Sequence, residues 1–256
     1  MHIIVGIKSV VTRAPRGEIV RTEGNCALNP FDRPALEVAR QLKVQHGATV
    51  TVISMGPPAT DAILREALAT GADRAVLLCD ATLAGADTLA TSTALQAGIA
   101  YLAPFDLLLF GTRTSDSDTG QVGPQTAVLL DVPMVTGVVK IDHNSRHNTV
   151  ERFVDGFREV FEVSGPAAFT IRPEAASPRD PPLGGLAAAF DNMTVEVLTM
   201  HDLGLTAKQV GEAGSPTRVL SVKPVSKARA CQWIEGTPGE QVAELVRCLS
   251  DTGLIV

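Results

Sequence analysis

Aromatic residues are scarce in this sequence, and so are the residue patterns that would indicate metal or thiol chemistry. Phe, Trp and Tyr make up 4% of the 256 residues, so the core must be mainly aliphatic. The cysteines are far apart and contain no CxxC pair; they are Cys26, Cys79, Cys231 and Cys248. No metal site is therefore expected, because the five histidines also lack ligand spacing. Reduced thiols are typical of a cytoplasmic protein.

Long apolar runs and an excess of basic residues are also missing. No stretch approaches the roughly 18 apolar residues that a membrane span needs, and the opening MHIIVGIKSV resembles a strand rather than a leader. The net charge is −6, with Lys and Arg scattered along the chain, which argues against a nucleic-acid partner. We therefore expect a soluble, cytoplasmic protein with no membrane span.

Short aliphatic runs alternate with amphipathic segments in the first half of the chain. Such runs, bounded by turn residues, are typical of buried parallel strands, and they occupy residues 2–7, 49–54, 74–79, 106–111 and 133–139. Residues 33–47 and 61–71 have the apolar spacing of helices that cover a sheet. The alternation predicts an α/β fold with a doubly wound, mostly parallel sheet.

The pattern changes in the second half. Alternating residues predict an antiparallel excursion at about 137–164, and residues 166–171 resemble another buried strand. From residue 172 the chain is rich in proline and glycine, and a helix is expected within 238–253. We expect a nucleotide-binding domain at 1–171, and an extended C-terminal arm with a helix at 172–256 that packs on a partner subunit.

The stretch SDSDTGQVGPQTA, residues 115–127, stands between a predicted strand and a predicted helix. Free amides at a helix start attract phosphate, and carboxylates accept hydrogen bonds from ribose or adenine. The GxGxxG, GxxxxGK[ST] and SGGxDS-like signatures are all missing, which favours nucleotide binding without chemistry on the phosphates. Two other helix starts carry Asp32 and Asp87, and each aspartate is equally well explained as a helix N-cap or as a ligand contact.

Several of these motifs, in order, resemble the β subunit of electron transfer flavoprotein over almost the whole chain. They are NPFDRPALEVARQLK, VISMGPPATDAILREALATGADRAVLL, GADTLATS and DTGQVGP, and more loosely VERFVDGFREVFEV. The resemblance implies an adenine-nucleotide-binding fold similar to that of universal stress proteins, and a C-terminal arm that embraces an α subunit.

The family resemblance allows two cofactors. Plain electron carriers hold AMP in the β subunit, whereas the bifurcating subgroup, linked to nitrogen fixation and to caffeyl-CoA, holds FAD there and takes a hydride from NADH. The motifs AGADTLATS, DTGQVGP and GSPT resemble the bifurcating versions, so FAD is preferred and AMP is the alternative. The resemblance gives no residue a catalytic role, since the flavin carries the chemistry.

Carried over from the family, the cofactor-binding residues lie on the adenosine side, under the nucleotide, around ribose and phosphate, and near the flavin. They are Ile7, Asn29, Asp32, Ser54, Met55, Gly56, Asp87, Thr88, Thr91, Gly111, Asp116, Asp118, Thr119, Gly120, Gln121, Val122, Gly123 and Pro124.

The sequence also departs from the family pattern. Ser117 replaces a glycine and is expected to restrict the approach of a pyrophosphate. Leu183 aligns with the leucine that docks into acyl-CoA dehydrogenases, but the tyrosine and lysines of that loop are missing. The redox partner is therefore left open between an acyl-CoA dehydrogenase-like protein and a quinone or ferredoxin type. Two further alternatives are a nucleotide-binding protein without redox function and a structural subunit whose pocket has decayed.

Overall fold

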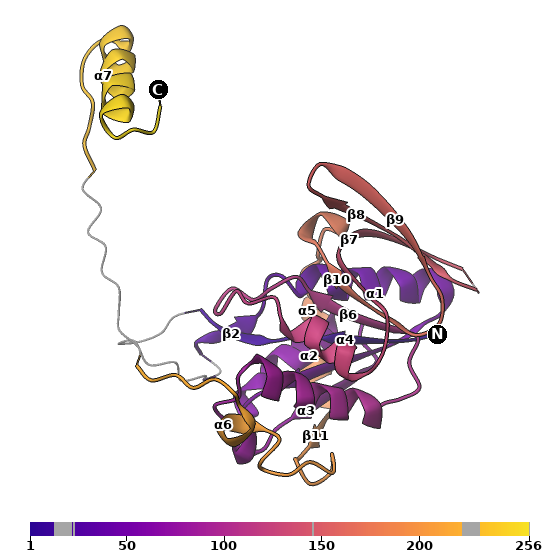
Figure 1. Ribbon diagram of the computed structural model, residues 1–256. Coiled ribbons are helices and arrows are strands. Elements are labelled where there is room, and N and C mark those ends of the chain that lie inside the picture. The colour runs from indigo at the N-terminus through magenta and orange to yellow at the C-terminus, as the bar shows by residue number, and fades with distance from the viewer. Residues whose placement is uncertain (13–21, 23, 145, 222–230, 256) are drawn as a thin grey trace. The chain divides into compact units, whose positions relative to one another are not determined.

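A computed structural model describes residues 1–12, 22, 24–144, 146–221 and 231–255 of the chain (Figure 1). The chain divides into two compact units, Met1–Leu220 and Ser221–Val256, and each is described by itself. The division lies later than residue 172, where the sequence placed the start of the arm, because residues 172–220 pack within the first unit.

A nine-stranded sheet of described residues forms the centre of the first unit, in the order β11-β5-β4-β1-β6-β10-β7-β8-β9. The neighbours from β11 to β7 are parallel, and β7, β8 and β9 are antiparallel. This confirms the predicted α/β class. The strands are β1 (His2–Gly6), β4 (Thr49–Met55), β5 (Arg74–Leu78), β6 (Leu107–Gly111), β7 (Met134–His143), β8 (Asn148–Val154), β9 (Phe157–Val163), β10 (Ala167–Ile171) and β11 (Val195–Leu198).

Two aliphatic clusters cover the two faces of the sheet. Because side chains alternate along a strand, Ile3 and Val5 of β1 belong to one cluster and Ile4 belongs to the other. The first cluster includes residues of α1 (Arg33–His46) and α2 (Asp61–Ala69). The second includes residues of α3 (Thr88–Tyr101) and α4 (Val122–Leu129).

The strand order reverses at β1, and this reversal positions the candidate site. From β1 the chain moves to β4 and β5 on one side, and it returns to place β6 on the other side of β1. In open α/β sheets, ligands bind beyond the carboxyl ends of the strands at such a point. The loop after β1 also holds a small antiparallel ladder of β2 (Ser9–Val11) and β3 (Cys26–Leu28).

The antiparallel excursion predicted at about 137–164 is formed by β7, β8 and β9. It leaves apolar side chains exposed at the turn between β8 and β9, where Phe153 is 51% and Phe157 71% exposed. Arg152 pairs with Glu159 across these strands at 2.6 Å. The excursion therefore presents a mixed apolar and charged surface.

The segment after β10 folds onto the first unit instead of extending from it. It contains η4 (Pro173–Ala175), α5 (Leu183–Asn192), β11 and α6 (Gly211–Gly214). Arg65 of α2 donates hydrogen bonds to the carbonyl oxygens of Ala189 and Met193 at 2.6 and 2.9 Å, which satisfies acceptors at the end of α5. Two short helices, η2 (Pro58–Thr60) and η3 (Ala81–Leu83), follow β4 and β5.

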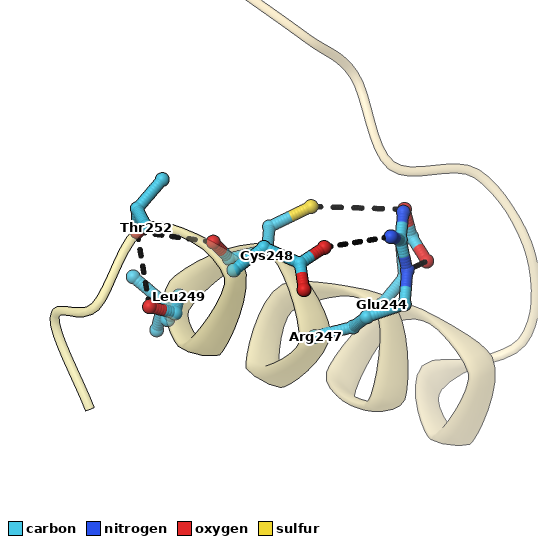
Figure 2. Close-up of polar contacts among 6 residues, drawn as sticks. Glu244, Arg247, Cys248, Leu249 and Thr252 are labelled. Atoms are coloured by element: carbon cyan, nitrogen blue, oxygen red, sulfur yellow. Dashed lines mark hydrogen bonds and ion pairs between the residues drawn. The ribbon is translucent and has the colours of Figure 1, made fainter. Parts of the chain in front are cut away.

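The second unit contains the predicted terminal helix, α7 (Pro238–Asp251). Thr237 and Glu240 form a capping box at its start. Figure 2 shows that the polar contacts of Glu244, Arg247 and Cys248 stay within neighbouring turns of the helix. Val242, Leu245 and Val246 form an apolar stripe along α7. Their side chains remain 47–61% exposed within this unit.

Candidate functional site

Asp32 joins three elements at the point where the strand order reverses. It stands at the N-cap position of α1 but makes no side-chain cap, and its Oδ2 accepts a hydrogen bond from the backbone amide of Lys8 at 2.8 Å. A β-carbon on Gly111, at the end of β6, would clash with Asp32 Oδ1 and with the carbonyl oxygen of Phe31. The glycine therefore permits the ends of β1 and β6 and the start of α1 to meet.

The carboxyl group of Asp32 is only 5% exposed, and its protonation is altered accordingly. Burial raises the pKa of Asp32 to about 7, although hydrogen bonding with Lys8, Asn29 and Gly111 opposes the shift. The group thus titrates near neutral pH. It is enclosed by protein, so it acts on the site mainly by holding the surrounding backbone.

Asn29, like Asp32, forms hydrogen bonds that hold the backbone around the site. Its side chain is fully buried, its Nδ2 donates to the carbonyl oxygen of Arg113 at 2.9 Å, and its Oδ1 accepts from the amide of Ser115 at 3.2 Å. The nitrogen and the oxygen of the Asn29 side-chain amide therefore both hold the loop that follows β6. Ile7 is buried beside it, and its backbone amide donates to the carbonyl oxygen of Ile53 at 3.0 Å.

Lys8 was not predicted as a site residue, yet it connects the loop to Asp32. Its Nζ pairs with Asp116 at 2.7 Å and lies 3.4 Å from the hydroxyl of Ser117. The Ser117 hydroxyl also lies 2.8 Å from that of Thr114, so it takes part in the internal hydrogen bonds of the loop. The signal in the sequence was a lone cation directly after the first strand.

The loop then turns sharply and exposes its polar groups. Asp118 and Gly120 have positive φ angles of 53° and 62°. Arg113 lies over the ring of Phe31 at 4.5 Å and forms an ion pair with Asp118 at 3.4 Å. Thr119 and Gln121 are exposed, as is Asp118. These side chains are available to a ligand, unlike Asn29 and Asp32.

The start of α4 offers backbone donors beside this loop. Its first helical hydrogen bond runs from Gln125 N to Gln121 O, so the amides of Val122 and Gly123 precede the ladder. No side chain in the described part of the chain caps the helix. Uncapped amides and the helix dipole favour an anion such as phosphate, and Pro124 has no amide to satisfy. A β-carbon on Gly123 would stand 3.2 Å from the ring of Phe110, so this glycine serves close packing of the helix on β6.

The end of β4 forms the neighbouring wall. The Ser54 hydroxyl is buried and has no hydrogen-bond partner among the described residues. Met55 and Gly56 are partly exposed, and a β-carbon on Gly56 would collide with the Thr60 hydroxyl. A ligand would therefore meet the backbone and the Met55 side chain here, and the Ser54 side chain only after rearrangement.

The start of α3 lies against the start of α4. The Thr88 hydroxyl donates to Gln121 Oε1 at 3.0 Å, which joins two of the predicted cofactor residues. Asp87 caps α3 by accepting from the amides of Leu89 and Ala90, each at 3.0 Å. Thr91, one turn further on, is partly exposed. The N-cap alternative for Asp87 is thus confirmed, whereas Asp32 makes no such cap.

A depression of about 420 Å³ adjoins the first residues of the same loop. It is lined by Phe31, Thr112, Arg113, Gly137, Arg172, Pro173 and Glu174. Within the described ranges, no group of three or more His, Cys, Asp or Glu side chains is arranged to hold a metal. The donors of this region suit an anionic organic ligand.

Comparison with known proteins gives the family. The electron transfer flavoprotein domain matches residues 17–202. The chain belongs to the electron transfer flavoprotein family. It is 39% identical, over the full length of both chains, to electron transfer flavoprotein subunit beta of Thermoanaerobacterium thermosaccharolyticum. It is 38% identical to the caffeyl-CoA reductase-Etf complex subunit CarD of Acetobacterium woodii, covering 93% of this chain and 92% of that one. It is 42% identical to protein FixA of Sinorhizobium fredii, covering 87% and 82%.

Leu183 is the residue predicted to contact a redox partner of this electron transfer flavoprotein chain. It begins α5, which packs against α2, and it is 85% exposed.

No helix of the described segments combines the length and apolar character needed to cross a bilayer.

Proposed function

We propose that this chain is the β subunit of a heterodimeric electron transfer flavoprotein, and that it holds FAD at the starts of α3 and α4. The observation that carries the proposal is the uncapped start of α4, where the amides of Val122 and Gly123 adjoin the exposed side chains of Asp118, Thr119 and Gln121. A pyrophosphate would accept hydrogen bonds from these amides. Carboxylate and amide side chains suit the ribose hydroxyls.

The residues of the chain position the cofactor and perform no bond-making of their own. Asn29, Asp32 and Lys8 fix the loop after β6, and Met55 lies at the adjoining strand end. When bound, FAD would supply the chemistry by accepting a hydride from NADH and passing electrons onward. The similarity to CarD and FixA supports placing this chain in the bifurcating subgroup. The motifs AGADTLATS, DTGQVGP and GSPT resemble the versions found in that subgroup.

The α subunit is the proposed partner, and two surfaces suit it. The stripe of Val242, Leu245 and Val246 on α7 is exposed within its own unit, as an arm that embraces a partner requires. The excursion of β8 and β9 exposes Phe153 and Phe157 beside an Arg152–Glu159 pair. Leu183, exposed on α5, is the proposed contact for an external redox partner.

An anaerobic NADH titration of the purified heterodimer tests the choice of FAD. The proposal expects two flavins per heterodimer, one of them bound by this chain. NADH should reduce the flavin of this chain, and a substitution that disrupts the site at the starts of α3 and α4 should remove that flavin. A single flavin per heterodimer together with bound AMP would contradict FAD and leave a plain electron carrier. The test therefore separates the two family alternatives.

A further inference from the structure

Residues 215–217, which follow α6, are held on the start of α3 by Asp87. The backbone amide and hydroxyl of Thr217 both donate to Asp87 Oδ2, at 3.0 and 2.8 Å. The Ser215 hydroxyl accepts from the Asp87 amide at 2.8 Å and donates to the carbonyl oxygen of Gly211 at 2.7 Å. Two motifs about 130 positions apart, GADTLATS and GSPT, thus form one hydrogen-bonded unit.

The Asp87 carboxylate has no acceptor left for a cofactor. Oδ1 accepts from the amides of Leu89 and Ala90, and Oδ2 accepts twice from Thr217. Two hydrogen bonds on each oxygen match the acceptor capacity of an ionised carboxylate. Asp87 is therefore a positioning residue rather than a cofactor contact.

The backbone around α6 is seated closely on the segment that precedes α3. The Glu212 amide donates to the carbonyl oxygen of Ala84 at 2.9 Å. Gly211 has a φ of 58°, and a β-carbon there would collide with the carbonyl oxygen of Thr82. This contact packs α6 closely against the segment that leads into α3.

The same helix start is bonded to the proposed nucleotide loop. Thr88, next to Asp87, donates to the Gln121 side chain at 3.0 Å. One turn later, the Ser92 hydroxyl lies 3.3 Å from the carbonyl oxygen of Val122 and 3.1 Å from Gln125 Oε1. Two hydrogen-bonded links, Gln121 with Thr88 and Asp87 with Thr217, are therefore joined through the peptide bond between Asp87 and Thr88.

We infer that Asp87 couples the nucleotide site to the point where the chain leaves the first unit. This inference rests on the proposed function, because it takes the ligand phosphate to lie at the start of α4. Phosphate bound there fixes Gln121, and the Thr88 and Asp87 bonds carry that restraint to Thr217. Leu220, three residues further on, is the last residue of the first unit. Nucleotide binding and ordering of this exit segment must then strengthen each other equally.

Hydrogen exchange on the full chain tests the coupling, with FAD and AMP as the added ligands. Amide exchange of the segment containing Thr217 should slow at least threefold when either nucleotide binds to the wild type. Thr88→Val removes the bond to Gln121 and leaves the Asp87 cap, so it should abolish that slowing when exchange is compared at nucleotide concentrations at which titration shows the site of each variant to be filled. Thr93→Val is the matched control, because among the described residues the Thr93 hydroxyl bonds only to the carbonyl oxygen of Leu89 on the same helix.

A second variant tests the coupling from the other end. Thr217 is exposed, so Thr217→Val should fold normally, and it should weaken nucleotide binding about three- to tenfold by reciprocity. The coupling is wrong if the wild type binds nucleotide with no change in exchange near Thr217, or if Thr217→Val binds as tightly as the wild type. Failure of the wild type to bind any nucleotide would instead overturn the proposed function, and the coupling with it.

Discussion

The backbone amide of Lys8 donates a hydrogen bond to the buried carboxylate of Asp32 at 2.8 Å, across the reversal of the strand order. This bond connects the end of β1 to the start of α1, and the Lys8 side chain extends the connection to Asp116 in the loop after β6. The shape of the proposed nucleotide site therefore depends on a carboxyl group that is almost fully buried.

The first prediction concerns stability against pH. Burial raises the pKa of Asp32 from 3.8 to about 7, so the folded state binds the proton more tightly than the unfolded state. This contribution to stability is fully present below about pH 4 and is lost as the pH rises to about 7, with a span of about 4 kcal/mol. Denaturant unfolding across this pH range measures it.

Asp32→Asn should remove that pH dependence, because the amide is neutral at every pH tested. At pH 8 the substitution removes a buried charge but places an NH2 donor where a carboxylate oxygen accepted from a backbone amide, so the two effects on the free energy of unfolding should largely offset each other. Asp118→Asn, in the loop after β6 and 62% exposed, is the control and should keep the wild-type profile. An unchanged profile in Asp32→Asn would show that this carboxyl is ionised normally.

The second prediction concerns the close approach at Gly111. Gly111→Ala places a β-carbon against Asp32 and the Phe31 carbonyl group, and neither can move freely. It should destabilise the first unit by about 1–3 kcal/mol. Gly184→Ala, in α5 with open space around it, should be neutral or stabilising. Equal unfolding midpoints for the two variants would refute the close packing.

Much of this arrangement follows from the sequence, and the rest depends on contacts between distant segments. The strands at 2–6, 49–55, 74–78 and 107–111 were predicted because aliphatic runs between turn residues leave few alternatives. The edge strand β11 was missed, because its four residues alternate weakly and become a strand only by pairing with β5. The pairing of β11 with β5 joins segments that are distant in the chain, so it cannot be predicted from the local sequence of either one.

Site prediction has the same limit. The residues around 118–124 could be proposed from the polar side chains and glycines of the loop and from the family motif, and the structure brings Gln121 against Thr88 of a second motif. The missing side-chain cap of α4 could not be read from the sequence, which offers Asp118 and Thr119 as caps. The enclosed positions of Asn29 and Ser54 could not be read from residue type, because a polar side chain after a strand is equally typical of a ligand contact. The hydrogen bond between Asp87 and Thr217 could not be predicted either, because it joins two motifs, GADTLATS and GSPT, that are distant in the chain.

The third prediction concerns the start of α4. Gln121→Glu keeps an acceptor for the Thr88 hydroxyl and adds a negative charge that the helix dipole favours, so the empty chain should remain as stable as the wild type. Nucleotide affinity should nevertheless fall at least about tenfold, because the carboxylate repels the phosphate. Calorimetric titration with FAD and AMP measures both effects.

Gln125→Glu is the matched control for that substitution. It makes the same change of charge and shape one turn along α4, where Gln125 accepts from Ser92. Its affinity should change much less than that of Gln121→Glu. Equal losses in the two variants would place the phosphate elsewhere.

The fourth prediction concerns the apolar stripe of α7. Val246→Asp should weaken binding of the α subunit at least about tenfold, because a charge would be buried in the interface. Ala243→Asp, exposed and off the stripe, should have little effect. Neither variant should shift the unfolding of the first unit. Association measured on the purified subunits decides the result, and unimpaired binding by Val246→Asp would exclude the stripe as the contact.

The most direct test of the central claim is the number of adenine nucleotides released when the purified heterodimer is denatured. The proposal predicts two per heterodimer, one from the α subunit and one from this chain. A value of one would show that the starts of α3 and α4 hold no nucleotide, and would contradict the site proposed here.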